Sequence, residues 1–190
     1  LALRNAVLFP GTVYPITIGR EKSIRLIEDA ERNNAFIGAV PQNDLAVEDP
    51  REQDLYQYGT VAKIVKTLEM PDGTITAILQ GYRRFEIESV VEYMPYMLGR
   101  VRYLEDIVPE QDTKVRMIAE SLKEKATQII RSSSLVPREA LSALKGIDSF
   151  EFLVNFIATT IEVENFMDKV ELLQYEDLKT RSMKLLSVLE

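Results

Sequence analysis

The chain has 190 residues, 46% of them hydrophobic, which is enough for one large domain or two small ones with a real hydrophobic core. Its 23 basic and 30 acidic side chains give a net charge of -7, which argues against nucleic acid and anionic membranes as partners. Cysteine and histidine are both absent, which excludes disulfides, the usual zinc sites and Ser-His or Cys-His catalytic pairs.

Two strands are predicted at the start of the chain. Leu1 to Phe9 has the composition of a strand from its first residue, and Val13 to Ile18 alternates with its larger apolar residues on one side. Pro10-Gly11 marks a turn between them. Pro15 indicates an edge position for the second strand, because proline has no N–H to donate to a neighbouring strand.

A helix and a further strand follow. Apolar residues at helical spacing predict a helix from Glu21 to Asn33, and they form one stripe of Ile24, Leu26, Ile27 and Ala30. Phe36 to Val40 is a short apolar run of strand length. The polar residues from Gln42 to Asp54, with Pro50 among them, predict a loop.

Gly59 to Glu88 is the strongest local signal, and it predicts a β-hairpin around which the first region is organised. Its turn is Pro71-Asp72-Gly73, in which proline presets φ, aspartate bonds back to the backbone and glycine accepts a positive φ. Gly81, inside the second strand, indicates a bulge or a close backbone approach. The alternation is expected to place Ala62, Ile64, Leu68 and Met70 on one face before the turn, and Ile75, Ala77 and Leu79 on one face after it.

A change in composition marks a domain boundary. Leu98 to Leu104 alternates and predicts the last strand, and seven of the eight glycines and six of the eight prolines lie before residue 105. The expected class is α+β, with a β-rich lobe over residues 1–106 and an all-α lobe over residues 107–190.

Five helices are predicted after the boundary. Pro137 suits a first helical position and Gly146 the residue after a helix end, while Asp148 with Glu151 resembles a capping box that opens the third helix. The predicted segments are about Asp112 to Arg131, Pro137 to Lys145, the capped helix carrying Leu153, Phe156, Ile157 and Ile161, Glu164 to Leu173, and Asp177 to Leu189.

Both ends of the chain have the character of cut ends. Leu1 is not an initiating methionine and already lies in strand-like sequence. The last helical pattern, Leu178 to Glu190, ends without glycine, proline or asparagine. We therefore expect a fragment truncated at both ends.

Catalytic motifs are missing from the sequence. No Gly-Lys dipeptide is present, so the phosphate-binding loop of an ATPase cannot form. Acidic pairs such as Glu48 with Asp49, or Glu162 with Glu164, lie among polar residues and are interpreted as solvated surface. No serine and lysine have a spacing that would position a nucleophile. We expect no catalytic, cofactor-binding or metal-binding residues in this segment.

Three stretches are candidates for binding. Arg83-Arg84, between Tyr82 and Phe85, suggests a surface for single-stranded nucleic acid, but the two arginines point to opposite faces of a strand, which favours one arginine bonding at a sheet end. The run Tyr93-Met94-Pro95-Tyr96-Met97 concentrates aromatic and thioether side chains, which accept varied apolar partners; a packed loop is the alternative. Exposed charges also open the first helix, at Glu21, Lys22 and Arg25, where an ordinary solvated face is the alternative.

A series of short motifs runs in a fixed order along the chain. They are Leu3-Arg4-Asn5, Phe9-Pro10-Gly11, Gly19-Arg20-Glu21-Lys22-Ser23, Gln42, Glu48-Asp49-Pro50, Leu55, Gly59-Thr60-Val61-Ala62, Pro71-Asp72-Gly73-Thr74, Gly81, Arg84, Pro137-Arg138-Glu139 and Gly146-Ile147-Asp148. Together these motifs resemble the amino-terminal domain of the ATP-dependent Lon proteases. No single motif makes the match specific, but their order and spacing do, and Ala2 departs from it where the family often has proline.

The resemblance implies a PUA-like lobe of small twisted sheets followed by a helical bundle, in a non-catalytic domain that recruits unfolded or damaged proteins. It also implies a cytoplasmic, homo-hexameric parent in which ATP and magnesium serve a separate ATPase module beside a Ser-Lys protease module. The substrate-binding candidates are Glu21, Lys22, Arg25, Tyr93, Met94, Tyr96 and Met97. A stand-alone adaptor remains an alternative, and so does an RNA-binding module, although the negative charge opposes the latter.

Overall fold

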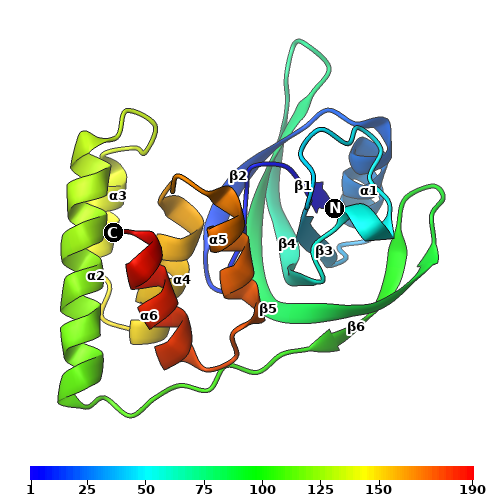
Figure 1. Cartoon of the computed structure of the whole chain (residues 1–190). Helices are drawn as coiled ribbons and strands as arrows, with labels where there is room; N and C mark the ends of the chain where they lie inside the picture. The colour runs from blue at the N-terminus through cyan, green and yellow to red at the C-terminus, as the bar shows by residue number, and fades with distance from the viewer. The chain divides into compact units, whose positions relative to one another are not determined.

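A long antiparallel hairpin of β4 (Tyr58–Glu69) and β5 (Ile75–Glu92) organises the sheet of the protein, whose computed structural model describes residues 1–190 (Figure 1). In its turn Gly73 has a φ of 85°, and Asp72 accepts hydrogen bonds from the backbone and the hydroxyl of Thr74. The strand-turn-strand prediction is therefore confirmed.

The tip of this hairpin departs from the prediction. Leu68 and Met70 were expected to share a face with Ala62 and Ile64, but they are 45% and 44% exposed, whereas Ala62 is fully buried. The reason is a register shift in β4 between Ile64 and Lys66, which places Thr67 opposite the buried Ala77 and Leu68 opposite Thr76 on the other face. Strand β3 (Ile37–Pro41) pairs with β4 only as far as Ala62. On the other side of the hairpin β2 (Val13–Ile18) pairs with β5 as far as Ile75, so only the turn extends beyond the other strands (Figure 1).

The remaining strands complete a six-stranded sheet of order β1-β3-β4-β5-β2, in which β6 also pairs with β5. Strands β2 (Val13–Ile18) and β6 (Leu98–Tyr103) are antiparallel to β5, whereas β1 (Ala2–Leu3) is parallel to β3. Strand β2 pairs only with β5, so the edge position inferred from Pro15 is confirmed.

The prediction of a strand from Leu1 to Phe9 is wrong beyond the two residues of β1. Asn5 has a φ of 48° and turns the chain out of the extended conformation. The segment that follows is apolar because it is buried, not because it pairs in the sheet. Its backbone is bonded partly by side chains, since the Thr60 hydroxyl donates to the Leu8 carbonyl at 2.6 Å.

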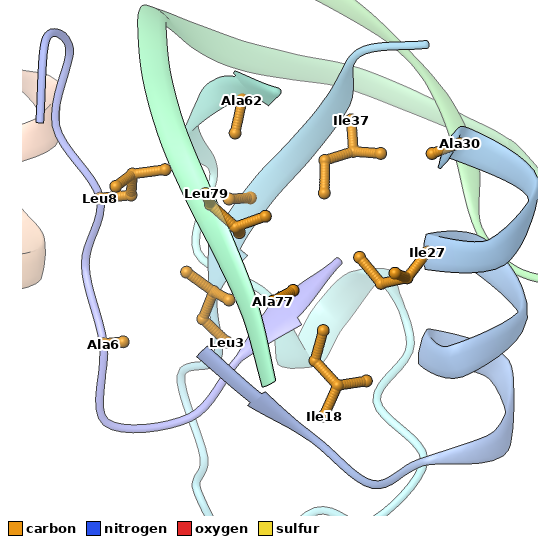
Figure 2. Packing of buried hydrophobic residues seen from close by; sticks show 11 residues of the cluster. Leu3, Ala6, Leu8, Ile18, Ile27, Ala30, Ile37, Ala62, Ala77 and Leu79 are labelled. Carbon is orange, nitrogen blue, oxygen red and sulfur yellow. The ribbon is translucent and has the colours of Figure 1, made fainter. Parts of the chain in front are cut away.

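The core of this region lies between the sheet and α1 (Glu21–Arg32), which begins and ends close to the predicted bounds. Figure 2 shows Ile27 and Ala30 pointing from α1 towards the strands. Both are buried, as their helical spacing predicted, and they pack with Ala62, Ala77 and Leu79, each of them fully buried. The prediction that Ala77 and Leu79 share one face of the hairpin is thus confirmed.

Gly81 makes the close backbone approach that its position in β5 indicated. It exchanges backbone hydrogen bonds of 2.9 Å with the turn at Gly11 and Thr12, and a register shift in β4 faces it. A Cβ atom at position 81 would lie 2.4 Å from the carbonyl oxygen of Phe9. Only glycine fits there without a backbone shift.

We predict that Gly81→Ala destabilises the protein by about 1–3 kcal/mol, because the contact is with backbone that cannot rotate away. Urea denaturation followed by circular dichroism measures the loss. Gly19→Ala is the matched control, since its Cβ would meet only a methyl group of Thr74 at 3.4 Å. Equal stability of the two variants would contradict the prediction.

All five helices predicted after the boundary are present. They are α2 (Thr113–Ser132), α3 (Glu139–Lys145), α4 (Phe150–Thr160), α5 (Phe166–Glu171) and α6 (Leu178–Val188). Short 3-10 turns occur at Glu52–Asp54 and Leu172–Gln174. The protein is therefore of mixed α and β structure, as expected.

The predicted cap at Asp148 is wrong. The side chain of Ser149, not Asp148, accepts from the backbone N–H of Phe152 at 3.2 Å and begins α4. Gly146 does end α3, but with a φ of -82° rather than in the left-handed conformation. The backbone at position 146 therefore does not require glycine, although the sequence pattern indicated that it would.

Two compact units divide the chain, Leu1–Leu104 and Glu105–Glu190. The first contains the six strands and α1, and the second contains α2 to α6. No helix in either is long and apolar enough to cross a membrane.

Candidate functional site

A cavity of about 730 Å³ in the first unit lies where three segments distant in sequence meet. These segments are the start of α1, the loop around Asp49 and the connection between β5 and β6. Six of the seven predicted binding residues line it, namely Glu21, Lys22, Tyr93, Met94, Tyr96 and Met97. We call this cavity the charged groove.

The charged wall of the groove is built at the start of α1. Arg20 precedes the helix without capping it, and its guanidinium instead donates to the side chain of Gln42, which is fully buried. Burial lowers the pKa of Arg20, as does the nearby charge of Arg4, while Glu48 and Asp49 oppose this effect. Charges of both signs are therefore concentrated at this end.

Two ion pairs hold the loop over residues 42–54, one from the start of α1 and one from the segment after β1. Lys22 Nζ lies 2.8 Å from Asp49 and Arg4 lies 3.0 Å from Glu48. Both pairs are at least one-third exposed, so each is worth no more than about 1 kcal/mol and weakens with salt. The acidic residues that were interpreted as solvated surface thus lie at a groove but remain accessible to solvent.

Arg25, the seventh predicted residue, does not line the groove. It pairs with Asp29 one turn further along α1, at 3.3 Å. Asp29 also accepts a hydrogen bond of 3.2 Å from the Tyr96 hydroxyl, and burial together with this carboxylate raises the pKa of Tyr96. Arg25 therefore reaches the groove through Asp29, which holds Tyr96, and through its own charge, which opposes the rise in the pKa of Tyr96.

The Tyr93–Met97 segment forms the apolar wall. Met94 is 69% exposed and Tyr93 is 43% exposed, with the Tyr93 hydroxyl donating to Glu52 at 3.4 Å. Tyr96 and Met97 are half-buried. The segment thus combines half-buried residues that fix it with exposed ones that are available for contact, and its role in binding stays a prediction.

A second cavity of about 300 Å³ adjoins the charged groove, and both are lined by Leu26 and Met97. Its walls are almost entirely apolar and come from α1, β3, β4, β5 and β6. We call it the apolar cavity. Its lining includes Phe36, Val61, Phe85, Ile87, Val90, Leu98, Val101 and Tyr103. Sequence reasoning missed it, because no one segment contributes enough of it to form a local signal.

The paired arginines of β5 are separated by the sheet, as predicted. Arg84 is 1% exposed, while Arg83 lies over the ring of Tyr103, 4.9 Å from its centroid. Only one basic side chain is therefore presented next to an aromatic ring at this point. A continuous stacking surface for nucleic acid is not formed by this pair.

Nothing in the chain resembles a metal centre, since no group of three or more acidic residues is arranged to hold an ion. The groove offers instead exposed thioethers and aromatic rings beside charges of both signs. Such a surface can make weak, varied contacts with polypeptides.

Comparison with known proteins matches the whole chain to one family. The family model described as the ATP-dependent protease La (LON) substrate-binding domain matches residues 1–190. The Lon protease of Flavobacterium johnsoniae is 44% identical over 187 residues, and that of Cytophaga hutchinsonii is 41% identical over 191 residues. These matches cover 98% and 100% of the chain but only 23% of each relative.

Solved structures show the same fold. The N-terminal domain of the Mycobacterium avium complex Lon protease matches with a TM-score of 0.74 at 18% identity, covering 100% of this chain and 95% of that one. The Lon N-terminal domain protein from Xanthomonas campestris matches with a TM-score of 0.62 at 17% identity, covering 98% of this chain and 95% of that one. At these identities the likeness concerns the fold alone.

Proposed function

The chain belongs to the LON substrate-binding domain family, and from this premise we propose that it recruits unfolded or damaged polypeptides through the charged groove. The observation that carries the proposal is the convergence of three distant segments on one groove. Their adaptable apolar side chains and exposed charges suit a ligand that is defined by exposed apolar groups rather than by one sequence.

Binding of this kind is expected to be weak at each site. Fully burying one large apolar side chain is worth only about 1.5–3 kcal/mol. Several simultaneous contacts are then needed, and a homo-hexameric parent would multiply them. The proposed parent is an ATP-dependent serine protease of the cytoplasm, in which ATP and magnesium act outside these residues.

We place the domain in such a protease rather than in a stand-alone adaptor, because the relatives that match it are Lon proteases of which it spans 23%. The first unit would form a PUA-like lobe, and the helices of the second a bundle. RNA binding is disfavoured by the net charge of -7.

We predict that Met94→Ser combined with Met97→Ser weakens binding of a labelled, permanently unfolded protein by about 5–30-fold, which corresponds to about 1–2 kcal/mol of lost apolar contact. The weakening should persist at all salt concentrations. Fluorescence anisotropy measures it, and circular dichroism checks the fold. The matched control is Met117→Ser with Met183→Ser, since both methionines are exposed in the second unit, at 62% and 57%.

The charged residues should behave differently. Lys22→Ala is expected to change affinity at low salt and to have no effect at high salt, because exposed charges are screened. A folded Met94 and Met97 double variant that binds as tightly as the control pair would show that the Tyr93–Met97 segment is only a packed loop.

A further inference from the structure

Strand β6 is exposed along its whole length. All six of its residues are exposed, and in the sheet it pairs only with β5. Val101 and Tyr103 are 36% and 52% exposed and line the apolar cavity. An edge strand next to an apolar cavity is an unusual feature, because such edges promote unwanted pairing unless they are protected or used.

The backbone N–H and C=O groups of successive β6 residues point alternately towards β5 and towards the free edge. The N–H of Leu104 donates to Arg84 of β5 at 3.0 Å, and the register pairs Arg102 with Glu86 and Val101 with Ile87. In an antiparallel ladder successive residues point their N–H and C=O groups to opposite sides. Leu104 and Arg102 therefore face β5, while Val101 and Tyr103 present their backbone groups to the free edge.

The opposite strand supports this assignment. Ile87, which faces Val101, donates its N–H at 2.8 Å to Gln57, on the β4 side of β5. That N–H is therefore not directed at β6. The pair of Ile87 and Val101 is a non-hydrogen-bonded pair, as the alternation requires.

We propose that an extended segment of an unfolded polypeptide adds as a strand to the free edge of β6, with alternate apolar side chains in the apolar cavity. This deepens the proposed function, on which it rests, by giving the mode of recognition. Backbone hydrogen bonds are common to every polypeptide, so strand addition supplies affinity without a sequence requirement. The charged groove, which adjoins the cavity at Leu26 and Met97, would hold the flanking residues.

The charge of the edge indicates a foreign segment rather than a second copy of this chain. Strand β6 carries Arg100 and Arg102 and no acidic residue, and of these two arginines Arg102 already pairs with Glu86 of β5. Pairing of two β6 edges would place arginines of the two copies beside one another, and like charges opposite each other in a sheet are destabilising. A segment that alternates apolar and acidic residues is complementary to this edge.

The direct test is residue-resolved amide hydrogen exchange, measured by NMR on the chain with and without a short peptide of alternating valine and glutamate. Strand addition is expected to slow exchange at Val101 and Tyr103 by about tenfold or more, because their N–H groups become bonded. Exchange at Leu104, already bonded to β5, serves as the internal control. Unchanged exchange at Val101 and Tyr103 under saturating peptide would overturn the proposal.

A pair of variants tests the same edge independently. Val101→Pro removes an outward N–H that no β5 residue accepts, whereas Val101→Ala removes side-chain area and keeps that N–H. We expect the proline variant to bind the peptide at least about tenfold more weakly than the alanine variant, with both folded by circular dichroism. Equal affinity would contradict strand addition.

Three further outcomes distinguish strand addition at β6 from polypeptide binding in the charged groove, the proposal on which it rests. Binding of an unfolded protein that depends on Met94 and Met97 but leaves β6 exchange unchanged would retain the groove and reject the added strand. Failure of the unaltered chain to bind any unfolded protein would reject both. Slower exchange at Val101 that grows with protein concentration, without peptide, would identify β6 as an interface between copies and overturn the foreign-segment assignment.

Discussion

Replacing Arg181 by methionine is expected to destabilise the second unit by about 3–5 kcal/mol, the range for removing one partner of a buried ion pair. The Arg181 side chain is fully buried, and its guanidinium makes a two-pronged pair with Asp106 at 2.7 and 3.0 Å. It also donates to Asn155 on α4 and twice to the carbonyl of Tyr175. One side chain thus ties α6 to three other parts of the unit.

The size of the effect follows from what methionine leaves behind. The Asp106 carboxylate, whose side chain is only 11% exposed, loses its guanidinium partner, and the Tyr175 carbonyl loses two donated hydrogen bonds. Methionine fills much of the volume of arginine, so little of the loss is due to a cavity. The effect is therefore mainly electrostatic.

Thermal and urea unfolding, followed by circular dichroism in the helical region, measure this prediction. Arg131→Met, at an exposed position in the last turn of α2, is the matched control and should change stability by less than about 0.5 kcal/mol. Adding Asp106→Leu to Arg181→Met should restore part of the loss, because an apolar pair can replace a buried ion pair. Equal stability of the Arg131 and Arg181 variants would contradict this account.

Such buried charges could not be predicted from the sequence, for a definite physical reason. In a helical pattern arginine and lysine are expected on the solvated face, and this expectation fails only where distant partners meet them. Arg181 finds Asp106 at a separation of 75 residues and Asn155 at 26. No local pattern carries information over such distances.

Local signals, by contrast, predicted the elements well. The Pro-Asp-Gly turn and the alternation around it gave the β4–β5 hairpin, and helical spacing gave α1 and α2 close to their observed bounds. The predictions failed where apolar residues do not follow the alternation of a regular strand. Leu8 is buried in irregular chain, and Leu68 follows a register shift in β4 that turns it to the other face of the hairpin.

In the candidate site, too, local sequence predicted some features, while others depend on contacts between distant segments. The Tyr-Met segment and the charges that open α1 were singled out by residue type, but that they face one another across a groove depends on how the sheet and α1 pack. Their role in binding stays a prediction. The apolar cavity and the free edge of β6 were not predicted, because both depend on strand register.

Lys169 provides a pH-dependent prediction in the second unit. Its side chain is 6% exposed, and its amine donates to the carbonyls of Thr159 and Ile161, at the end of α4, at 2.9 and 2.8 Å. Burial lowers the pKa of Lys169 from 10.5 to about 8, against the opposing attraction of Glu162. The folded chain therefore releases this proton at a lower pH than the unfolded chain does.

The sign follows from proton binding. Between about pH 8 and 10.5 the unfolded chain keeps the Lys169 proton while the folded chain has lost it, so the free energy of unfolding rises with pH. The two pKa values correspond to a gain of about 3 kcal/mol across this interval. Below about pH 8 both states are protonated, and Lys169 contributes no pH dependence.

Urea denaturation of the chain at a series of pH values from 7 to about 10.5, compared with Lys169→Met, isolates this contribution, because other titrating groups cancel in the difference. Methionine removes the donors to the end of α4, which lowers stability by an amount that does not vary with pH. The difference between the two proteins should therefore widen as the pH rises through 8. Lys184→Met, at an exposed position of α6, should give a constant difference instead. A Lys169→Met difference that is equally flat would mean that the buried amine keeps its proton throughout, held by the two carbonyls and Glu162.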